Sequence, residues 1–249
     1  MKRRNALKSI GALLGLSAAA PGMAFDLGKA MGAAKSLGDA ATLSDADLNR
    51  YFDQVSAKYD QSNTVAPPGD KYAKRLTALS DGLQSYDGLN LNFKVYLKPE
   101  VNAFAMGNGT VRVYSGLMDL MSDDEVRYVI GHEMGHVKAG HSKERMKAAL
   151  TTDAARSAIA ASDSKVAALA ESQIGELFQK VVLAQHSQAN ENQADDYAMN
   201  FLKQTKHDPM AAVTALEKLD KLSGGGGGGW MSTHPAPAAR AKRMREKLA

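Results

Sequence analysis

Residues 129–137 read Val-Ile-Gly-His-Glu-Met-Gly-His-Val. On an α-helix, at about 100° per residue, residues four positions apart lie roughly 40° apart, so His132 and His136 share one face. Both imidazoles can then bind one Zn²⁺ at about 2.0–2.1 Å, while Glu133 faces the open coordination position. The alternative is a pair of ordinary helix histidines. This stretch predicts a catalytic site for one Zn²⁺ per chain.

The composition narrows the chemistry of such a site. The 249 residues include no cysteine, which excludes disulfides, Cys-liganded zinc, a Cys nucleophile and a Cys-linked lipid anchor. The formal net charge is +4, but residues 1–24 carry four basic residues and no acid; 31 basic residues less these four leave 27, equal to the 27 acids. A neutral mature chain argues against a nucleic-acid partner. The length suits a single domain with an ample core.

Residues 1–24 form a predicted export signal. They combine a basic start at residues 2–8, an apolar stretch at residues 10–20 and a small-residue cleavage site ending at Ala24. The apolar stretch is too short to span a hydrocarbon core roughly 30 Å thick. Residues 2–8 also resemble a twin-arginine signal, although Ala6 replaces the usual Phe. We expect export to the periplasm by the Sec or twin-arginine route, with peripheral membrane association left open; an amphipathic helix of a cytosolic protein is the alternative.

The remaining chain is predicted to be a flexible linker at residues 25–42 followed by one α+β, mainly helical domain at residues 43–249. Gly107-Asn108-Gly109 is hairpin-turn chemistry between two apolar runs, which predicts a small antiparallel sheet packed on the motif helix. No apolar run in the Ala-rich helical insert at 142–185 is long enough for a membrane helix, and a Gly-rich loop is expected at 223–233. Helices are expected at residues 43–58, 72–83, 190–202, 209–222 and 237–248, and strands at 91–97, 103–106 and 110–114.

The motif helix has a recognisable start. Ser122 followed three residues later by Glu125 predicts a capping box. The apolar spacing from Val126 to Val137 would seat the helix on the sheet, and we expect it to continue to about His141.

A catalytic zinc keeps three protein ligands and one open position, so the histidine pair needs a partner. On a helix continued to His141, that residue lies about 180° from His132 and cannot reach the same ion. The three-histidine pattern fails because Ser142 and Ala139 occupy its diagnostic positions.

A glutamate is therefore expected as the third ligand. Glu191, on a separate predicted helix, ranks ahead of Glu171 and Glu176, and Glu144 is too close along the chain to fold back. Asp195 lies one turn after Glu191 and could accept a hydrogen bond from the second nitrogen of a ligand histidine. A solvated acidic face is the alternative.

Five stretches together resemble a known family: residues 132–136, Glu191-Asn-Gln-Ala-Asp195, Asn102-Ala-Phe-Ala-Met-Gly107, Val113-Tyr-Ser-Gly-Leu-Met-Asp119 and Thr233-His-Pro235. They are similar to the zinc endopeptidases that include HtpX and the CAAX prenyl proteases, from about Ala57 to the C-terminus. The resemblance implies a gluzincin-like fold, His132, His136 and Glu191 as zinc ligands, and Glu133 as general base. The glycine run at 224–229 has no counterpart in the family pattern.

The resemblance also implies that His234 lies near the site, where it is our candidate for oxyanion stabilisation; Arg240 is the weaker candidate, and a loop histidine held by Pro235 is the alternative. An extended substrate could pair with an edge strand, and the expected substrate-binding residues are Asn102, Ala103, Phe104 and Ala105.

The predicted function is a zinc endopeptidase that cleaves unfolded or misfolded polypeptides of the cell envelope. The alternative is a catalytically silent zinc-binding chaperone or assembly factor, which would not need Glu133. A third reading, membrane-surface or nucleic-acid binding through the basic helix at 237–248, is disfavoured by the neutral mature chain.

Overall fold

The computed structural model describes residues 43–150, 175, 178–223 and 229–249. The predicted export signal, the linker at 25–42, the central part of the Ala-rich insert and residues 224–228 of the glycine run lie outside the described residues. The described elements are α2 (Asp45–Ser62), α3 (Lys71–Leu79), the 3-10 turn η1 (Tyr86–Gly88), β1 (Asn92–Tyr96), β2 (Ala103–Ala105), β3 (Thr110–Tyr114), α4 (Ser115–Leu120), α5 (Asp123–Lys138), α6 (His141–Leu150), the π-helical turn η2 (Phe178–Val182), α9 (Gln188–Gln204), α10 (Ala211–Ser223), α11 (Trp230–Thr233) and α12 (Pro237–Glu246).

The three strands form one sheet in the order β1-β3-β2. β2 and β3 make the predicted antiparallel hairpin, with Ala103 opposite Val113. β1, however, runs parallel to β3, so the expectation of an antiparallel sheet is wrong for this pair and the sheet is mixed. The reason lies after β1, where the carbonyl of Lys98 accepts hydrogen bonds from Gly116 N at 2.8 Å and Ser115 Oγ at 2.7 Å. That segment is held by the start of α4, so β1 and β2 form no hairpin.

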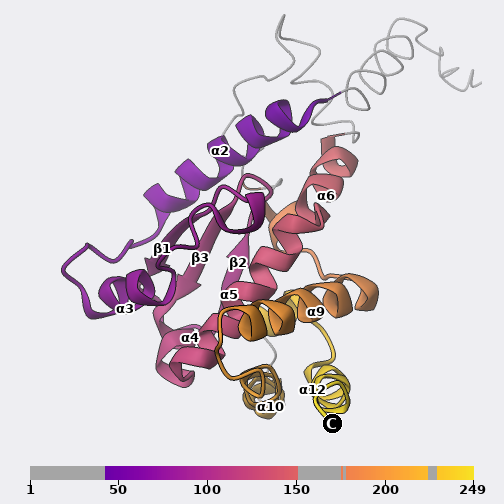
Figure 1. Ribbon diagram of the computed structural model, residues 1–249. Coiled ribbons are helices and arrows are strands. Elements are labelled where there is room, and N and C mark those ends of the chain that lie inside the picture. The colour runs from indigo at the N-terminus through magenta and orange to yellow at the C-terminus, as the bar shows by residue number, and fades with distance from the viewer. Residues whose placement is uncertain (1–42, 151–174, 176–177, 224–228) are drawn as a thin grey trace, which may run out of the picture.

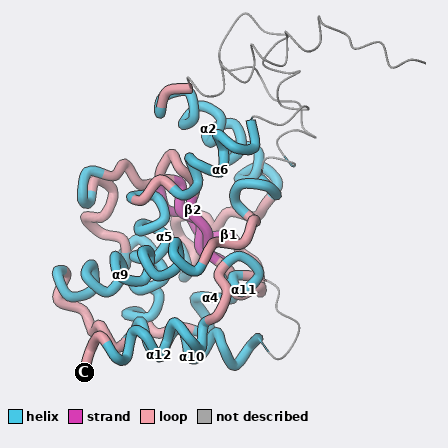
Figure 2. Tube along the Cα trace, turned by 90° about the vertical axis from the view of Figure 1, so that its right-hand side faces the viewer, coloured by secondary structure: helices cyan, strands magenta, loops and turns pink. Residues whose placement is uncertain are grey.

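Each face of the sheet carries its own core because side chains alternate along a strand. Val111 and Val113 of β3 face the cluster that contains Val129 and Ile130 of α5. Tyr114 faces the second cluster, with Phe104 of β2 and aromatic side chains of α2. The helices therefore form layers: α2 crosses one face of the sheet, α5 and α9 lie beyond the other, and α10 and α12 run side by side beyond α9 (Figures 1 and 2).

The motif helix α5 begins as predicted. Ser122 N donates to Glu125 Oε2 at 2.7 Å, and the Ser122 hydroxyl accepts from the Glu125 backbone N–H. The helix ends at Lys138, not near His141 as expected, because Gly140 has a φ of +74° and turns the chain. His141 therefore opens a separate helix, α6.

The described helices α9 and α10 begin and end within two residues of their predicted bounds. The short helices α4 and α11 have no predicted counterpart. Among the described ranges, no helix combines the length and apolar character that crossing a membrane requires.

Candidate metal centre

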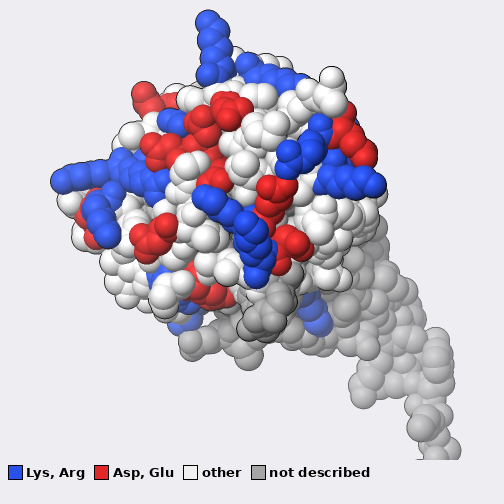
Figure 3. Space-filling model, turned by 90° about the horizontal axis from the view of Figure 1, so that it is seen from below, with Lys and Arg blue, Asp and Glu red and all other residues white. Residues whose placement is uncertain are grey.

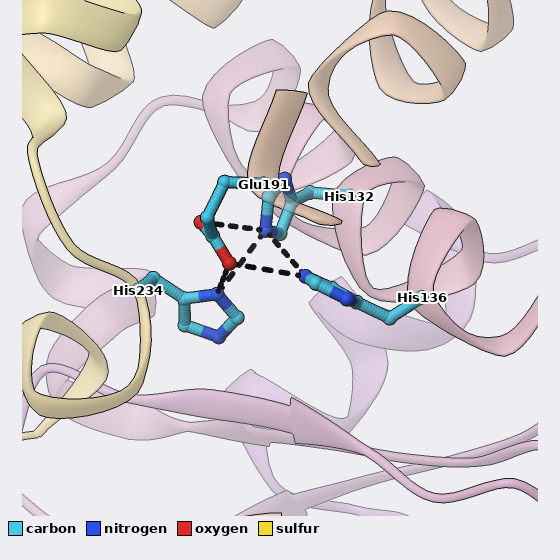
Figure 4. A group of neighbouring side chains, drawn as sticks. All are labelled: His132, His136, Glu191 and His234. Atoms are coloured by element: carbon cyan, nitrogen blue, oxygen red, sulfur yellow. Dashed lines mark hydrogen bonds and ion pairs between the residues drawn. The ribbon is translucent and has the colours of Figure 1, made fainter. Parts of the chain in front are cut away.

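Four buried side chains point toward one another (Figure 4). His132 and His136 come from α5, Glu191 from the first turn of α9, and His234 from the residue that ends α11. One nitrogen or oxygen of each lies within 4.8 Å of the others. None of the four side chains is more than 2% exposed. The structure therefore brings the three predicted ligands together with His234.

The distances within this cluster fit a tetrahedral ion. His132 Nε2 is 3.0 Å from His136 Nε2 and 3.6 Å from Glu191 Oε2, and His136 Nε2 is 3.5 Å from Glu191 Oε1. Ligand atoms bound to zinc at about 2.0–2.1 Å in a tetrahedron stand about 3.3–3.4 Å apart. The two nitrogens and the carboxylate can therefore share one ion with little rearrangement.

A charge balance favours a divalent cation. Glu133, Glu191 and Asp195 are fully buried carboxylates around the cluster, and Arg240 is the fully buried guanidinium beside them. Three negative charges against Arg240 and the partly buried Arg145 still leave a net negative formal charge in a region shielded from water, which is costly without compensation. A bound Zn²⁺ would neutralise this charge.

Asp195 takes the position predicted for it. Its Oδ1 lies 3.0 Å from His132 Nδ1 and accepts from Tyr128 Oη at 2.7 Å. A carboxylate accepts only, so Nδ1 of His132 carries the proton and Nε2 keeps its lone pair for a metal. Burial raises the pKa of Asp195, but the charge and hydrogen bonds of Arg240 outweigh it and hold that pKa well below its usual range.

Arg240 ties the two carboxylates together. Its Nε and Nη2 donate to Asp195 at 2.9 and 2.6 Å, and Nη1 forms an ion pair with Glu191 Oε2. The sequence placed Arg240 on a basic helix face and weighed it as a weak oxyanion donor. In the structure its guanidinium pairs with Asp195 and Glu191.

Glu133 lies beside the cluster, and Trp230 holds its carboxylate. Trp230 was not among the predicted site residues. Trp230 Nε1 donates to Glu133 Oε1 at 3.2 Å. The indole also stacks on His234, with ring centroids 4.2 Å apart. Trp230 is the single tryptophan of the chain and stands four residues before His234, which was a usable signal.

His234 faces both the cluster and Glu133. Its Nδ1 is 3.0 Å from Glu191 Oε1 and 3.2 Å from His132 Nε2, and its Nε2 is 3.4 Å from Glu133 Oε1. A ring in this place can donate to an oxygen that binds at the site.

Comparison with known proteins agrees with this geometry. The model of peptidase family M48 matches residues 77–248. The chain belongs to peptidase family M48. Metalloprotease LoiP of Escherichia coli (strain K12) is 46% identical over 205 residues, covering 82% of this chain and 81% of LoiP. Metalloprotease YcaL of the same organism is 40% identical over 206 residues, covering 82% and 81%. Protease HtpX of Stenotrophomonas maltophilia (strain K279a) is 50% identical over 50 residues, covering 18% and 17%.

Membership in family M48 confirms the resemblance inferred from the motifs, and with it the mainly helical metallopeptidase fold. It also supports metalloprotease activity, which is the chemistry that the names of LoiP and YcaL state for those proteins.

In this M48 peptidase, two glycines let α9 reach the histidines. A Cβ added at Gly135 would lie 2.9 Å from Ala194 Cα, and one added at Gly131 would lie 3.2 Å from Ala198 Cα. Each glycine directly precedes a histidine of the cluster, so the close helix contact lies beside the cluster. Their role depends on the approach of a second helix, which the spacing within residues 129–137 does not reveal.

The expectation that His141 lies outside the site is wrong, because the structure places it against His136. Its Nδ1 is 2.8 Å from His136 Nδ1. Because α5 ends at Lys138 and His141 opens α6, His132 and His141 are not on one continuous helix, and the expected separation of about 180° does not apply. Glu144 is exposed on α6, and the lower-ranked Glu171 and Glu176 lie outside the described residues.

The predicted substrate-binding residues form the edge strand β2 and its approach. Ala103, Phe104 and Ala105 are at most 6% exposed, and Phe104 points into the aromatic cluster beneath α2. Asn102 O and Met106 N pair with β3, so by antiparallel alternation the backbone groups of Ala103 and Ala105 face the other edge of β2, which pairs with no strand among the described residues. A substrate could meet these residues through backbone atoms alone.

The basic C-terminal helix does not form a uniform positive face. Arg243 and Lys247 both pair with Asp196, and Arg245 pairs with Glu217. Viewed from the side of α10 and α12, acidic and basic side chains are interspersed (Figure 3). Paired charges of this kind are typical of a solvated surface.

Proposed function

We propose that this chain is a zinc-dependent endopeptidase that hydrolyses unfolded or misfolded polypeptides in the cell envelope. The observation that carries the proposal is the buried convergence of His132, His136 and Glu191 beside Glu133. Membership in family M48 supports it.

His132, His136 and Glu191 would hold the zinc, and Asp195 fixes the tautomer of His132. A bound Zn²⁺ supplies Lewis-acid chemistry, because it polarises a carbonyl and lowers the pKa of water towards about 7. Burial raises the pKa of Glu191, but the neighbouring imidazoles of His234, His136 and His132 outweigh it and hold that pKa well below its usual range. Its carboxylate is therefore ionised and able to bind the cation.

Glu133 moves the protons of the reaction. It takes a proton from the attacking water and delivers it to the leaving amine. The Trp230 hydrogen bond to Oε1 leaves Oε2 for the water. His234 donates to the oxyanion of the tetrahedral intermediate, which in a buried site stabilises the transition state strongly.

The edge of β2 supplies the substrate contact. Its Asn102 side chain already accepts from Ala103 N, and Val101 O accepts from Trp230 N. Within the described part of the chain, the Ala103 carbonyl and the Ala105 N–H have no hydrogen-bond partner and could pair with an extended segment. Two backbone hydrogen bonds impose no side-chain preference, which suits unfolded polypeptides.

The proposed location in the cell envelope rests on the predicted export signal at residues 1–24. The basic, apolar and small-residue regions of residues 1–24 stand in the order of an export signal, which supports a periplasmic location. Intact-mass measurement of protein recovered from the periplasm should give a chain that begins at Phe25.

The test compares the mature protein with Glu133→Gln on a permanently unfolded protein substrate, with bound zinc measured in both. Because glutamine cannot accept a proton, we expect cleavage to fall by roughly 10²–10⁴-fold with zinc unchanged. Chelation should abolish wild-type cleavage, and added Zn²⁺ should restore it. Equal cleavage by the variant would contradict the assignment of Glu133. Failure of both proteins to cleave, with both suppressing substrate aggregation, would favour the chaperone alternative.

A further inference from the structure

We infer that His141 is a positioning residue for the metal ligand His136: it accepts the Nδ1–H of His136 and so turns the Nε2 lone pair of that ring towards the metal. The inference rests on the proposed zinc site and goes beyond it by naming the group that holds the second histidine. His141 is not itself a ligand in this assignment.

The contact between the two rings is short and buried. His136 Nδ1 and His141 Nδ1 lie 2.8 Å apart, and the residues are 1% and 5% exposed. The turn at Gly140 produces this contact, because it stops α5 and brings the first residue of α6 back against His136.

Gln193 sets the direction of the hydrogen bond. Its Oε1 lies 3.2 Å from His141 Nε2, and an amide oxygen only accepts, so His141 carries its proton on Nε2. The Nδ1 of a neutral His141 then holds a lone pair, and His136 Nδ1 must donate. The opposite direction would place the proton of His136 on Nε2, which is 3.0 Å from His132 Nε2 and faces the metal position. That arrangement would leave His136 without a lone pair for the ion.

A second metal site at this place is the competing interpretation, since His136, His141 and His186 also cluster. It requires His136 to bind a second ion through Nδ1 while Nε2 binds the first, which a neutral imidazole cannot do. In addition, the guanidinium of Arg145 contacts His186 Nδ1. This uses the nitrogen's lone pair and places a positive charge beside the cluster.

The two ligand histidines are therefore held by unlike partners. His132 donates to the carboxylate of Asp195, whereas His136 donates to a neutral ring that Gln193 orients from α9. Partners of this kind fix the orientation of a ligand, and their loss lowers metal affinity roughly 10–100-fold.

The experiment measures the zinc dissociation constant by chelator competition for wild type, His141→Asn and His141→Gln. The side-chain oxygen of Asn can take the place of Nδ1, whereas that of Gln reaches about as far as Nε2. We expect His141→Asn to stay within about threefold of wild type and His141→Gln to bind zinc roughly 10–100-fold more weakly. A role in packing alone would not separate the two amides in this way.

Controls separate this inference from the zinc site itself. Thermal unfolding of the metal-free proteins checks that both variants fold. Gln193→Leu should have a smaller effect, because Gln193 is exposed and water can replace it. Wild-type affinity in His141→Gln, or equal affinities of the two variants, would overturn the inference. His136→Ala tests the ligand set separately: if it bound zinc like wild type, the proposed site would fail.

Discussion

Asp195 and Asp196 are adjacent residues with opposite surroundings. Asp195 is fully buried among His132, Tyr128 and Arg240, whereas Asp196 is partly exposed and pairs with Arg243 and Lys247. The buried carboxylate accepts from His132, and its negative charge balances Arg240. The outer carboxylate makes surface ion pairs, which contribute little.

Asp195→Asn should weaken zinc binding by roughly 10–100-fold, because the variant loses the charged acceptor for His132 Nδ1 and leaves Arg240 with less compensation. Asp196→Asn is the matched control and should leave the zinc dissociation constant unchanged. Chelator competition on both variants decides the point. Equal zinc affinities would contradict the role assigned to Asp195.

For single residues, the helical repeat predicted correctly which side chains lie together when both residues are on one helix. The separation of His132 from His136, and of Glu191 from Asp195, follows from the helical repeat. The roles of Trp230 and Arg240 could not be read in that way. They depend on α11 and α12 packing against α5 and α9, contacts between segments far apart in the chain.

The contact between α5 and α9 brings His132, His136 and Glu191 together. Gly131 and Gly135 present no side chain to α9, so Ala194 and Ala198 approach the α5 backbone closely. Glu191 is delivered from the first turn of α9 by this contact.

Gly135→Ala should therefore be harmful despite the better helix propensity of alanine. Helix propensity alone predicts a gain of about 1 kcal/mol in the free energy of unfolding. Overpacking against Ala194 costs about 1–3 kcal/mol, so we expect a net loss of about 1 kcal/mol and weaker zinc binding. Urea unfolding and zinc titration measure both effects. A variant more stable than wild type, with unchanged zinc affinity, would contradict the close packing.

Element positions were largely predictable because capping residues and apolar periodicity are local signals. The capping box of Ser122 is an example. The partner of β1 was not predictable, because alternation shows that a strand has two faces but not which neighbour it joins. The end of α5 was placed too late because Gly140 was not weighed as a stop signal, and that error removed His141 from the site.

The molecule as a whole is held together on both sides of its small sheet. On the face away from the metal centre, Asp60 of α2 accepts from Arg112 Nε and Nη2 at 2.8 and 3.0 Å, from Lys94 at 2.6 Å and from Tyr96 Oη at 2.8 Å. Burial raises the pKa of Asp60, but these partners outweigh it and lower the pKa to about 2.

This anchor predicts a specific acid dependence. The pKa of Asp60 is lower in the folded protein than in the unfolded chain, at about 3.9. Its stabilising contribution is therefore complete above about pH 4 and is lost as the pH falls towards about 2.

Asp60→Asn should lower the free energy of unfolding at pH 7 by roughly 2 kcal/mol. This is less than the 3–5 kcal/mol lost on breaking a fully buried pair, because the Asp60 side chain is 18% exposed. The difference from wild type should shrink between about pH 4 and pH 2. Urea unfolding of both proteins across this range provides the measurement, and loss of zinc in acid affects both alike. A difference that stays constant down to pH 2 would contradict the assignment.

The family and the helical fold could be inferred from motifs spread over most of the chain, since their combination is specific even though each alone is short. The arrangement of layers around the site required the three-dimensional structure. The central claim is that His132, His136 and Glu191 hold one zinc ion. Its most direct test is zinc-edge anomalous diffraction from crystals of the mature Glu133→Gln protein. The account predicts one peak about 2.0–2.1 Å from Nε2 of both histidines and from a carboxylate oxygen of Glu191. A peak bound by His141 and His186 without Glu191, or no peak at this cluster in zinc-loaded crystals, would contradict it.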